Sequence, residues 1–213
     1  MSEHMALENL TVLDLTRGLA GPFCTMMLAD MGANVIKIEV PKGGDDTRSY
    51  PPFRAKNLNG ERESVYFANI NRNKKGITLN LKAPEGKEIF KELVKKADIV
   101  VENYRPGVMD KLGLGYDVLK EINPRIIYAA VSGFGCYGPY HLRPGYDILA
   151  QAMGGMMSIT GSKGGEPTRA GSALGDILGG LHVTIGILAA VNARTITGKG
   201  QRVDVSLMDS MIA

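Results

Sequence analysis

The first forty residues alternate short apolar runs with residues that favour turns. Residues 10–15 and 33–39 are short, apolar and rich in β-branched side chains, so both segments are predicted strands. Residues 17–22 between them form a predicted turn. Residues 23–31, rich in Met, Leu and Ala, form a predicted helix that the proline of the turn begins and Gly32 ends. A strand, a turn, a helix and a second strand in this order predict parallel strands joined by a right-handed crossover.

The rest of the chain continues this alternation. Further strands are predicted at residues 77–82, 98–102, 125–131 and 201–207, and further helices at 84–97, 116–122, 147–156 and 176–197, with another beginning at 208. In the helix that Pro84 begins, Ile89, Leu93 and Val94 are the predicted buried stripe. Residues 41–62 and 132–145 are predicted surface loops. Together these elements predict an α/β fold, with an open, mainly parallel Rossmann-like sheet covered by helices on both faces.

Composition and charge narrow the class of protein. The chain has 213 residues, of which 44% are hydrophobic and 22% charged, as in ordinary soluble domains. A formal net charge of +3 gives no field that favours nucleic acid as a partner. Two cysteines do not make a disulfide scaffold, and the first ten residues do not resemble a signal peptide, so a cytoplasmic protein is expected. The most apolar segment, residues 178–191, is too short to span a bilayer, so no membrane is expected.

The turn at residues 17–22 is a candidate ligand site. Ligands of open α/β sheets bind beyond the carboxyl ends of the strands, where helix N-termini attract phosphate. Arg17 offers a positive charge, and Gly18 and Gly21 allow a ligand to approach the backbone. Glu39 ends the next strand, where an acidic residue meets a ribose in dinucleotide-binding folds. The G-x-x-G spacing is not the dinucleotide fingerprint, so a plain turn and a ligand-binding turn remain equal alternatives.

Asp176 lies among glycines at the start of the long predicted helix. Its position alone favours a helix N-cap over a carboxylate that acyl groups can reach. His182 follows six residues later, about 600° around a helix, so it faces elsewhere and is predicted to pack against other elements.

Other reactive or charged side chains form no catalytic pattern. His4 and His141 lack the neighbours of a metal site, and Cys136 has no histidine placed to activate it. A basic group is expected to be mostly solvated, with some members able to reach phosphates: Arg48, Arg72, Lys74 and Lys75.

Eight segments taken together resemble the class III (CaiB/BaiF-type) CoA transferases. They are residues 12–22, 32–39, 45–48, 71–75, 101–107, 132–135, 143–147 and 197–201. Each segment alone is weak evidence for the family, but eight segments in the same order are highly specific for it. The resemblance implies that residues 1–213 are the N-terminal part of a large CoA-binding Rossmann-like domain. The small domain and the C-terminal return would then be missing, and the full-length protein would be an interlocked homodimer.

The resemblance also implies site residues and reverses the preference for a cap at Asp176, which becomes the catalytic aspartate. The implied CoA-binding residues are Arg17, Leu19, Ala20, Leu79, Lys82, Asn103, Tyr104 and Lys111. No metal and no tightly bound cofactor are implied. Coenzyme A and acyl-CoA are substrates, and a carboxylic acid is the acceptor. Backbone N–H groups near Gly175 and Gly179 are candidate oxyanion donors, and Arg48 hints at a carboxylate-binding arginine for an acidic substrate.

The implied reaction is CoA transfer through an aspartyl-CoA thioester on Asp176. The alternative from the same superfamily is an α-methylacyl-CoA racemase, in which an R-x-G-H-D stretch supplies a histidine base. Here Tyr146 occupies that position, and a phenol with a pKa of about 10 is a poor base at neutral pH. A CoA-binding module without chemistry is the third alternative.

Overall fold

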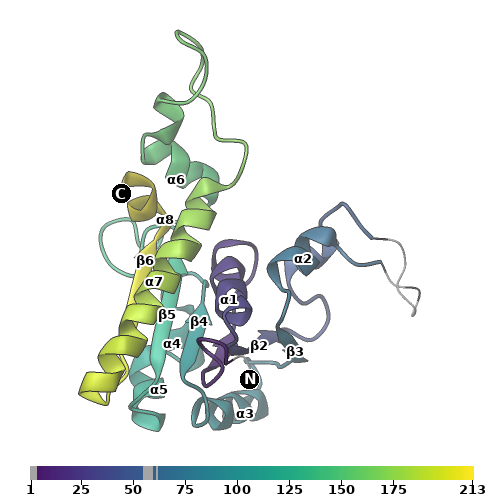
Figure 1. Cartoon of the computed structure of the whole chain (residues 1–213), viewed down its shortest axis with the longest axis vertical. Coiled ribbons are helices and arrows are strands. Elements are labelled where there is room, and N and C mark those ends of the chain that lie inside the picture. Colours follow the sequence, from purple (N-terminus) through teal and green to yellow (C-terminus); the bar gives the residue numbers. More distant parts are fainter. Residues whose placement is uncertain (1–3, 55–59, 61) are drawn as a thin grey trace.

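The protein folds around one parallel β-sheet. A computed structural model describes residues 4–54, 60 and 62–213 (Figure 1). Its strands are β1 (Thr11–Asp14), β2 (Asn34–Glu39), β3 (Lys75–Thr78), β4 (Ile99–Glu102), β5 (Ile127–Ser132) and β6 (Arg202–Ser206). They lie in the order β3-β2-β1-β4-β5-β6, and every neighbouring pair is parallel. The predicted open, parallel α/β sheet is confirmed.

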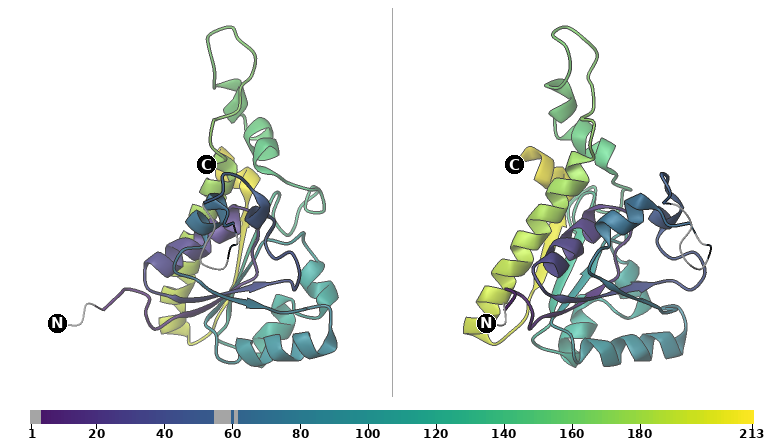
Figure 2. Two further views of the ribbon diagram at one scale, coloured as in Figure 1. Left: turned by 90° about the vertical axis from the view of Figure 1, so that its right-hand side faces the viewer. Right: turned by 45° about the vertical axis from the view of Figure 1, so that its right-hand side comes forward.

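Helices cover both faces of this sheet, as predicted. They are α1 (Ala20–Asp30), α2 (Val65–Ile70), α3 (Pro84–Val94), α4 (Val108–Leu112), α5 (Tyr116–Ile122), α6 (Asp147–Met153), α7 (Leu174–Thr197) and α8 (Leu207–Ile212), with short 3-10 helices η1 (Asp46–Ser49) and η2 (Met156–Ser158). α1 and α7 pack on one face, and α3, α4 and α5 on the other (Figures 1 and 2). The segment between α6 and α7 extends away from the sheet (Figure 2).

Alternation along the strands builds two cores, one on each face. Val12 packs with Leu28 of α1 and Ile187 of α7. Its neighbour Leu13 points to the opposite face and packs with Phe90 of α3. Fully burying side chains of this size contributes roughly 1.5–3 kcal/mol each. The two cores therefore fix the sheet and, with it, the positions of the turns at its carboxyl edge.

Two helices begin earlier than predicted. α1 begins at Ala20, so Pro22 is its third residue, and α7 begins at Leu174, so Asp176 is its third residue. The first-turn N–H groups of a helix have no partner within the helix, so proline is tolerated there beyond the first position. Gly198 follows the end of α7 with φ of +69°, which confirms the predicted stop.

The segment predicted as a surface loop at residues 41–62 is in part buried. Asp45 and Thr47 are fully buried where η1 begins, which corrects the prediction. Residues 55–59 and 61 lie outside the described residues. α2, which follows, was not predicted, and β3 lies two or more residues before the predicted strand. In α3, Ile89 is half exposed and Phe90 takes the predicted buried place.

α7 corrects the expectation about apolar segment length. It has 24 residues, and one 18-residue window has a mean hydropathy of 1.8, so by length and composition it could cross a membrane. In the fold it packs against α1, β5 and β6 through side chains such as Val183 and Ile187. This packing buries 39% of that window.

Candidate functional site

A cleft of about 750 Å³ lies at the carboxyl edge of the sheet. Open α/β folds bind ligands at this edge. The turns after β1 and β4 and the loop after β5 all contribute to its walls. Seven of the nine sequence-predicted site residues line it: Arg17, Leu19, Ala20, Lys82, Asn103, Tyr104 and Asp176. The fold therefore brings residues far apart in the sequence into one cleft.

The other two predicted residues are not on its walls. Leu79, just after β3, packs on the core beneath α3. Lys111 is exposed on α4, whereas Val108 and Leu112, four residues apart on that helix, line the cleft. A role for Leu79 or Lys111 in binding CoA stays a prediction.

Asn103 joins the two turns that form the floor of the cleft. Its Oδ1 accepts a hydrogen bond from the Arg17 N–H at 2.9 Å, and its Nδ2 donates to the Arg17 carbonyl at 2.6 Å. The Arg17 guanidinium lies 5.4 Å from the centre of the Tyr104 ring, in a cation–π contact. A positive charge is thus held at the cleft, where it suits a phosphate group.

Glu39 does not face the cleft as a ribose-binding acid would, which corrects the sequence-based interpretation. Its carboxylate accepts two hydrogen bonds from the Arg48 guanidinium, at 2.8 and 2.6 Å, and one from the Asp45 N–H. Burial would raise the pKa of Glu39, but these bonds outweigh it and the pKa is lowered. The pair occupies the Nε and Nη2 edge of the Arg48 guanidinium, and Arg48 is not among the residues that line the cleft.

Lys74 is the clearest departure from the expected solvated basic group. Its side chain is 2% exposed, and its ammonium donates to Asp14, Asn71 and the Pro22 carbonyl. Arg72, in contrast, forms a half-exposed ion pair with Asp30. The N-R-N-K-K segment does not indicate which lysine turns beneath α1, so sequence reasoning missed the buried one.

Asp176 is a half-buried carboxylate in the wall of the cleft. It is not the N-cap of α7: Asp147, on α6, accepts the Gly175 N–H at 2.7 Å instead. Burial, helped by the negative charge of Asp147, raises the pKa of Asp176 to about 6. None of the hydrogen bonds among the described residues involves its carboxylate. The cap interpretation is therefore wrong, and the carboxylate is chemically available.

The candidate oxyanion donors do not hold up. The Gly175 N–H already donates to Asp147. Gly179 is buried within α7, and a Cβ there would lie 2.5 Å from Leu207 Cδ2. This glycine allows α7 to pack closely on α8. Gly179 is the sixth residue of α7, so its N–H is bonded within the helix and is not free for an oxyanion.

Three tyrosines line the cleft that were not predicted as site residues, namely Tyr50, Tyr66 and Tyr146. Tyr66 lies on α2, and burial, with the charge of Asp176, raises its pKa. The available signal was Ser64, which caps α2 by accepting the Phe67 N–H at 3.2 Å. Tyr146 also lines the cleft, just before α6, but was considered only as a substitute for histidine.

A close backbone crossing fixes the loop that carries Tyr146. A Cβ on Gly133, after β5, would lie 2.2 Å from the Gly145 Cα. The two ends of this one loop, between β5 and α6, can meet at this distance only because both residues are glycines. The crossing holds Pro144 and Tyr146 against the same cleft as Asp176.

The remaining candidate groups have no catalytic arrangement. Burial raises the pKa of the Cys136 thiol to about 11, so it is a poor nucleophile at neutral pH. His182 is half-buried on α7. Within the described part of the chain, no group of three or more His, Cys, Asp or Glu side chains could hold a metal ion.

Comparisons with known proteins agree on one family. The model of CoA-transferase family III matches residues 7–213. The succinyl-CoA:mesaconate CoA-transferase of Haloarcula marismortui is 48% identical over 214 residues, covering 98% of this chain and 53% of that enzyme. The acetyl-CoA:oxalate CoA-transferase of Acetobacter aceti is 49% identical over 207 residues, covering 97% of this chain and 52% of that enzyme. A CAIB/BAIF family protein from Brucella suis has a crystal structure that matches with a TM-score of 0.94 at 45% identity, over 99% of this chain and 55% of that one. The chain thus spans about half the length of the curated relatives it matches.

Proposed function

The chain belongs to CoA-transferase family III, and from that premise we propose that the full-length protein transfers CoA from an acyl-CoA to a free carboxylic acid through a thioester on Asp176. The observation that carries this proposal is the Asp176 carboxylate itself. It lies in the same cleft as Arg17 and Asn103, and none of the hydrogen bonds among the described residues involves it. A carboxylate so placed is available as a nucleophile.

The proposed reaction exchanges one activated carboxyl group for another. An Asp176 oxygen attacks the acyl carbon of the donor and the C–S bond breaks. The products are CoA thiolate and a mixed anhydride of Asp176 with the donor acyl group. The thiolate attacks the aspartyl carbon, which forms the aspartyl-CoA thioester and releases the donor acid. The acceptor carboxylate then attacks the aspartyl carbon, the C–S bond breaks, and a second mixed anhydride forms. The thiolate attacks the acceptor acyl carbon of this anhydride, which gives the acceptor acyl-CoA and releases the Asp176 carboxylate. Little free energy is lost, so the protein must chiefly exclude water.

We propose dicarboxylic acids as the substrate class. Mesaconate and oxalate, in the names of the two relatives, are both dicarboxylic acids. Beside Arg17, three further basic side chains line the cleft, namely Lys82, Arg105 and Arg143. Arg143 is held by stacking on Tyr140, with its guanidinium carbon 4.0 Å from the ring centre. An arginine fork suits the second carboxylate of such a substrate.

The test is an exchange assay with the full-length protein. A panel of acyl-CoAs is incubated with isotopically labelled dicarboxylic acids, and new acyl-CoAs are identified by mass spectrometry. The expected result is a labelled acyl-CoA formed with loss of the donor. Deuterium exchange at the α-carbon of a 2-methylacyl-CoA without transfer would favour the racemase. If the protein binds CoA but shows neither CoA transfer nor α-proton exchange, the remaining hypothesis is a CoA-binding module without catalytic activity.

The rate of transfer is expected to fall at low pH. The nucleophile is the carboxylate form of Asp176, whose pKa is raised to about 6. Below that pH the acid is protonated, so kcat/KM for the acyl-CoA should fall about tenfold per pH unit, and above it kcat/KM should level off. A pH–rate profile of the full-length protein measures this. A profile flat down to the ordinary aspartate pKa near 4 would contradict it.

We also propose that the full-length protein is a homodimer. Large apolar side chains are exposed on and around α6 and α7: Tyr146, Ile148, Ile159, Ile185, Ile196 and Ile212. Contact with a second copy would remove such surface from water, which is favourable at about 25 cal/mol per Å². A cytoplasmic location belongs to the same proposal, on the basis of the free thiols of Cys24 and Cys136.

A further inference from the structure

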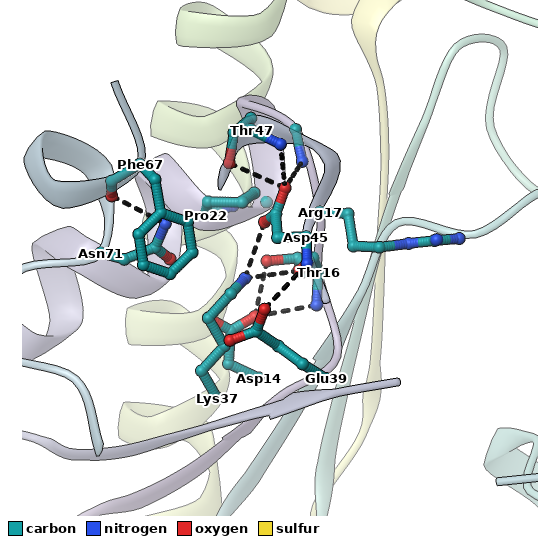
Figure 3. Close-up of polar contacts among 12 residues, drawn as sticks. Asp14, Thr16, Arg17, Pro22, Lys37, Glu39, Asp45, Thr47, Phe67 and Asn71 are labelled. Carbon is teal, nitrogen blue, oxygen red and sulfur yellow. Dashed lines mark hydrogen bonds and ion pairs between the residues drawn. The ribbon is translucent and has the colours of Figure 1, made fainter. Parts of the chain in front are cut away.

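A buried ion pair lies beneath the turn that follows β1 (Figure 3). Lys37 comes from β2 and its side chain is only 2% exposed. Its ammonium donates a hydrogen bond to the Thr16 carbonyl at 2.8 Å and lies 3.0 Å from Asp45 Oδ2. Lys37 therefore connects the second strand, the loop after it and the first turn.

Asp45 holds the same turn from the other carboxylate oxygen. Its Oδ1 accepts hydrogen bonds from the Gly18 N–H at 3.3 Å, from the Thr47 N–H at 3.0 Å and from the Thr47 hydroxyl at 2.8 Å. Oδ2 has Lys37 as its single partner among the described residues. Removal of the Lys37 ammonium would leave that oxygen buried and unpaired.

Side chains thus bind every backbone polar group from the Thr16 N–H to the Gly18 N–H. Asp14 Oδ1 accepts the Thr16 N–H at 2.9 Å, and Lys37 donates to the Thr16 carbonyl. Asn103 binds the N–H and the carbonyl of Arg17, and Asp45 binds the Gly18 N–H. The conformation of the turn is therefore imposed from outside it.

The cost of this arrangement points to a role other than stability. Moving an ammonium and a carboxylate out of water costs several kcal/mol per ion, and well-packed apolar residues of similar volume are often as stable or more so. Burial alone would raise the pKa of Asp45, but Lys37 and Thr47 outweigh it and the pKa is lowered, so Asp45 is a carboxylate at neutral pH. The charged side chains of Lys37 and Asp45 instead fix the orientation of the backbone groups that they bind, the Thr16 carbonyl and the Gly18 N–H.

We propose that Lys37 and Asp45 are positioning residues for acyl-CoA, acting through the Thr16 carbonyl and the Gly18 N–H to hold the turn that presents Arg17 to the cleft. The Arg17 side chain points away from the ion pair, and neither Lys37 nor Asp45 is among the residues that line the cleft (Figure 3). Leu19 and Ala20, the next residues of the turn and of α1, also line the cleft and move with it. This inference rests on the proposed function of the same site.

The test is the double variant Lys37→Met, Asp45→Asn in the full-length protein. Replacing both residues leaves no lone buried charge, and the asparagine oxygen still accepts from Gly18 and Thr47. Because small displacements of binding groups are costly, KM for acyl-CoA should rise about tenfold while kcat changes less than about threefold. The Kd for CoA, measured by calorimetry, should rise in parallel.

A second, partly buried ion pair provides the control. Arg194 Nη2 lies 3.0 Å from Asp98 Oδ1 at the opposite, amino edge of the sheet, and the side chains are 6% and 29% exposed. Arg194→Met, Asp98→Asn makes the same kind of change far from the cleft and should leave KM within about twofold of wild type.

Three outcomes would overturn the inference: an unchanged KM in the folded Lys37/Asp45 variant, an equal rise in both variants, or a loss confined to kcat. Should the double variant not fold, Lys37→Leu, Asp45→Asn, which removes the same bond to the Thr16 carbonyl and also leaves no lone buried charge, carries the same expectation. If the wild-type protein transfers CoA and the two double variants have the same KM, only the positioning role is rejected. A wild-type protein that neither binds nor transfers CoA rejects the proposed function, and the inference with it.

Discussion

Asp176→Asn in the full-length protein is expected to lower CoA transfer by at least about a thousandfold, while the fold is retained. The amide cannot form the mixed anhydride or the thioester, so the covalent route is closed. Arg17 and Asn103 are unchanged, so CoA should still bind with a Kd close to that of wild type. The exchange assay and calorimetry on the same preparation measure both quantities.

The same substitution should make the protein more stable at neutral pH. Because the pKa of Asp176 is raised to about 6 from 3.8, ionisation of this group opposes folding, and the cost is fully present above about pH 6. Removing the charge should therefore raise the free energy of unfolding by up to about 3 kcal/mol there, and the gain should vanish as pH falls toward 4. Lost activity with gained stability is typical of a functional site.

Asp209→Asn is the matched control. Asp209 is also the third residue of its helix, α8, but it is exposed and outside the cleft. Its replacement should change neither transfer nor stability by more than about 0.5 kcal/mol. Substantial transfer by Asp176→Asn, or an equal loss in the control, would contradict the role of Asp176.

Lys74→Met is expected to destabilise the protein by about 3–5 kcal/mol. Lys74 lies 3.1 Å from Asp14, and both side chains are almost fully buried. Burial would raise the pKa of Asp14, but Lys74 and Lys37 outweigh it and the pKa is lowered. Without Lys74, Asp14 keeps its hydrogen bonds from Thr16 and Thr25 but loses its nearest cation. Urea unfolding of the full-length protein measures the loss.

The pH dependence of this stability loss and a control substitution at the neighbouring Lys75 make the test more specific. The pairing of Asp14 with Lys74 stabilises the fold above the unfolded-state pKa of the carboxyl and is lost as pH falls, so the difference between variant and wild type should shrink in acid. Lys75→Met removes the adjacent lysine, which is exposed and bound to Asn34. That control should cost less than about 0.5 kcal/mol. Equal costs for the two lysines would show that burial of Lys74 does not matter.

The elements with strong apolar patterns were predictable from the sequence. α5 has its predicted bounds, and β1, β2 and β4 lie within the predicted strands. The strand predicted at residues 77–82 was misplaced relative to β3. All four residues of β3 are exposed at the sheet edge, so no alternation of apolar and polar side chains identifies this strand. α2, with only six residues, is too short for a helical period to appear.

The candidate site was predictable where motifs identify residues, but its supports were not. The resemblance selected Asp176, Arg17 and Asn103, which do meet in one cleft. Lys37 alternates with Ile36 and Ile38 on a strand, a pattern that suggests exposure. Lys37 is buried because Asp45 and the Thr16 carbonyl bind its ammonium. These partners come from other parts of the chain, so the pattern within the strand does not reveal them.

The most direct measurement of the central claim is chemical trapping of the intermediate. The full-length protein is incubated with an acyl-CoA donor and hydroxylamine, digested, and mapped by mass spectrometry. A hydroxamate on Asp176, formed only in the presence of acyl-CoA and absent from Asp176→Asn, is the predicted result, because hydroxylamine attacks an aspartyl thioester at the carbonyl carbon. Donor-dependent transfer with an unmodified Asp176, or with a hydroxamate on another carboxylate, would contradict catalysis through this residue.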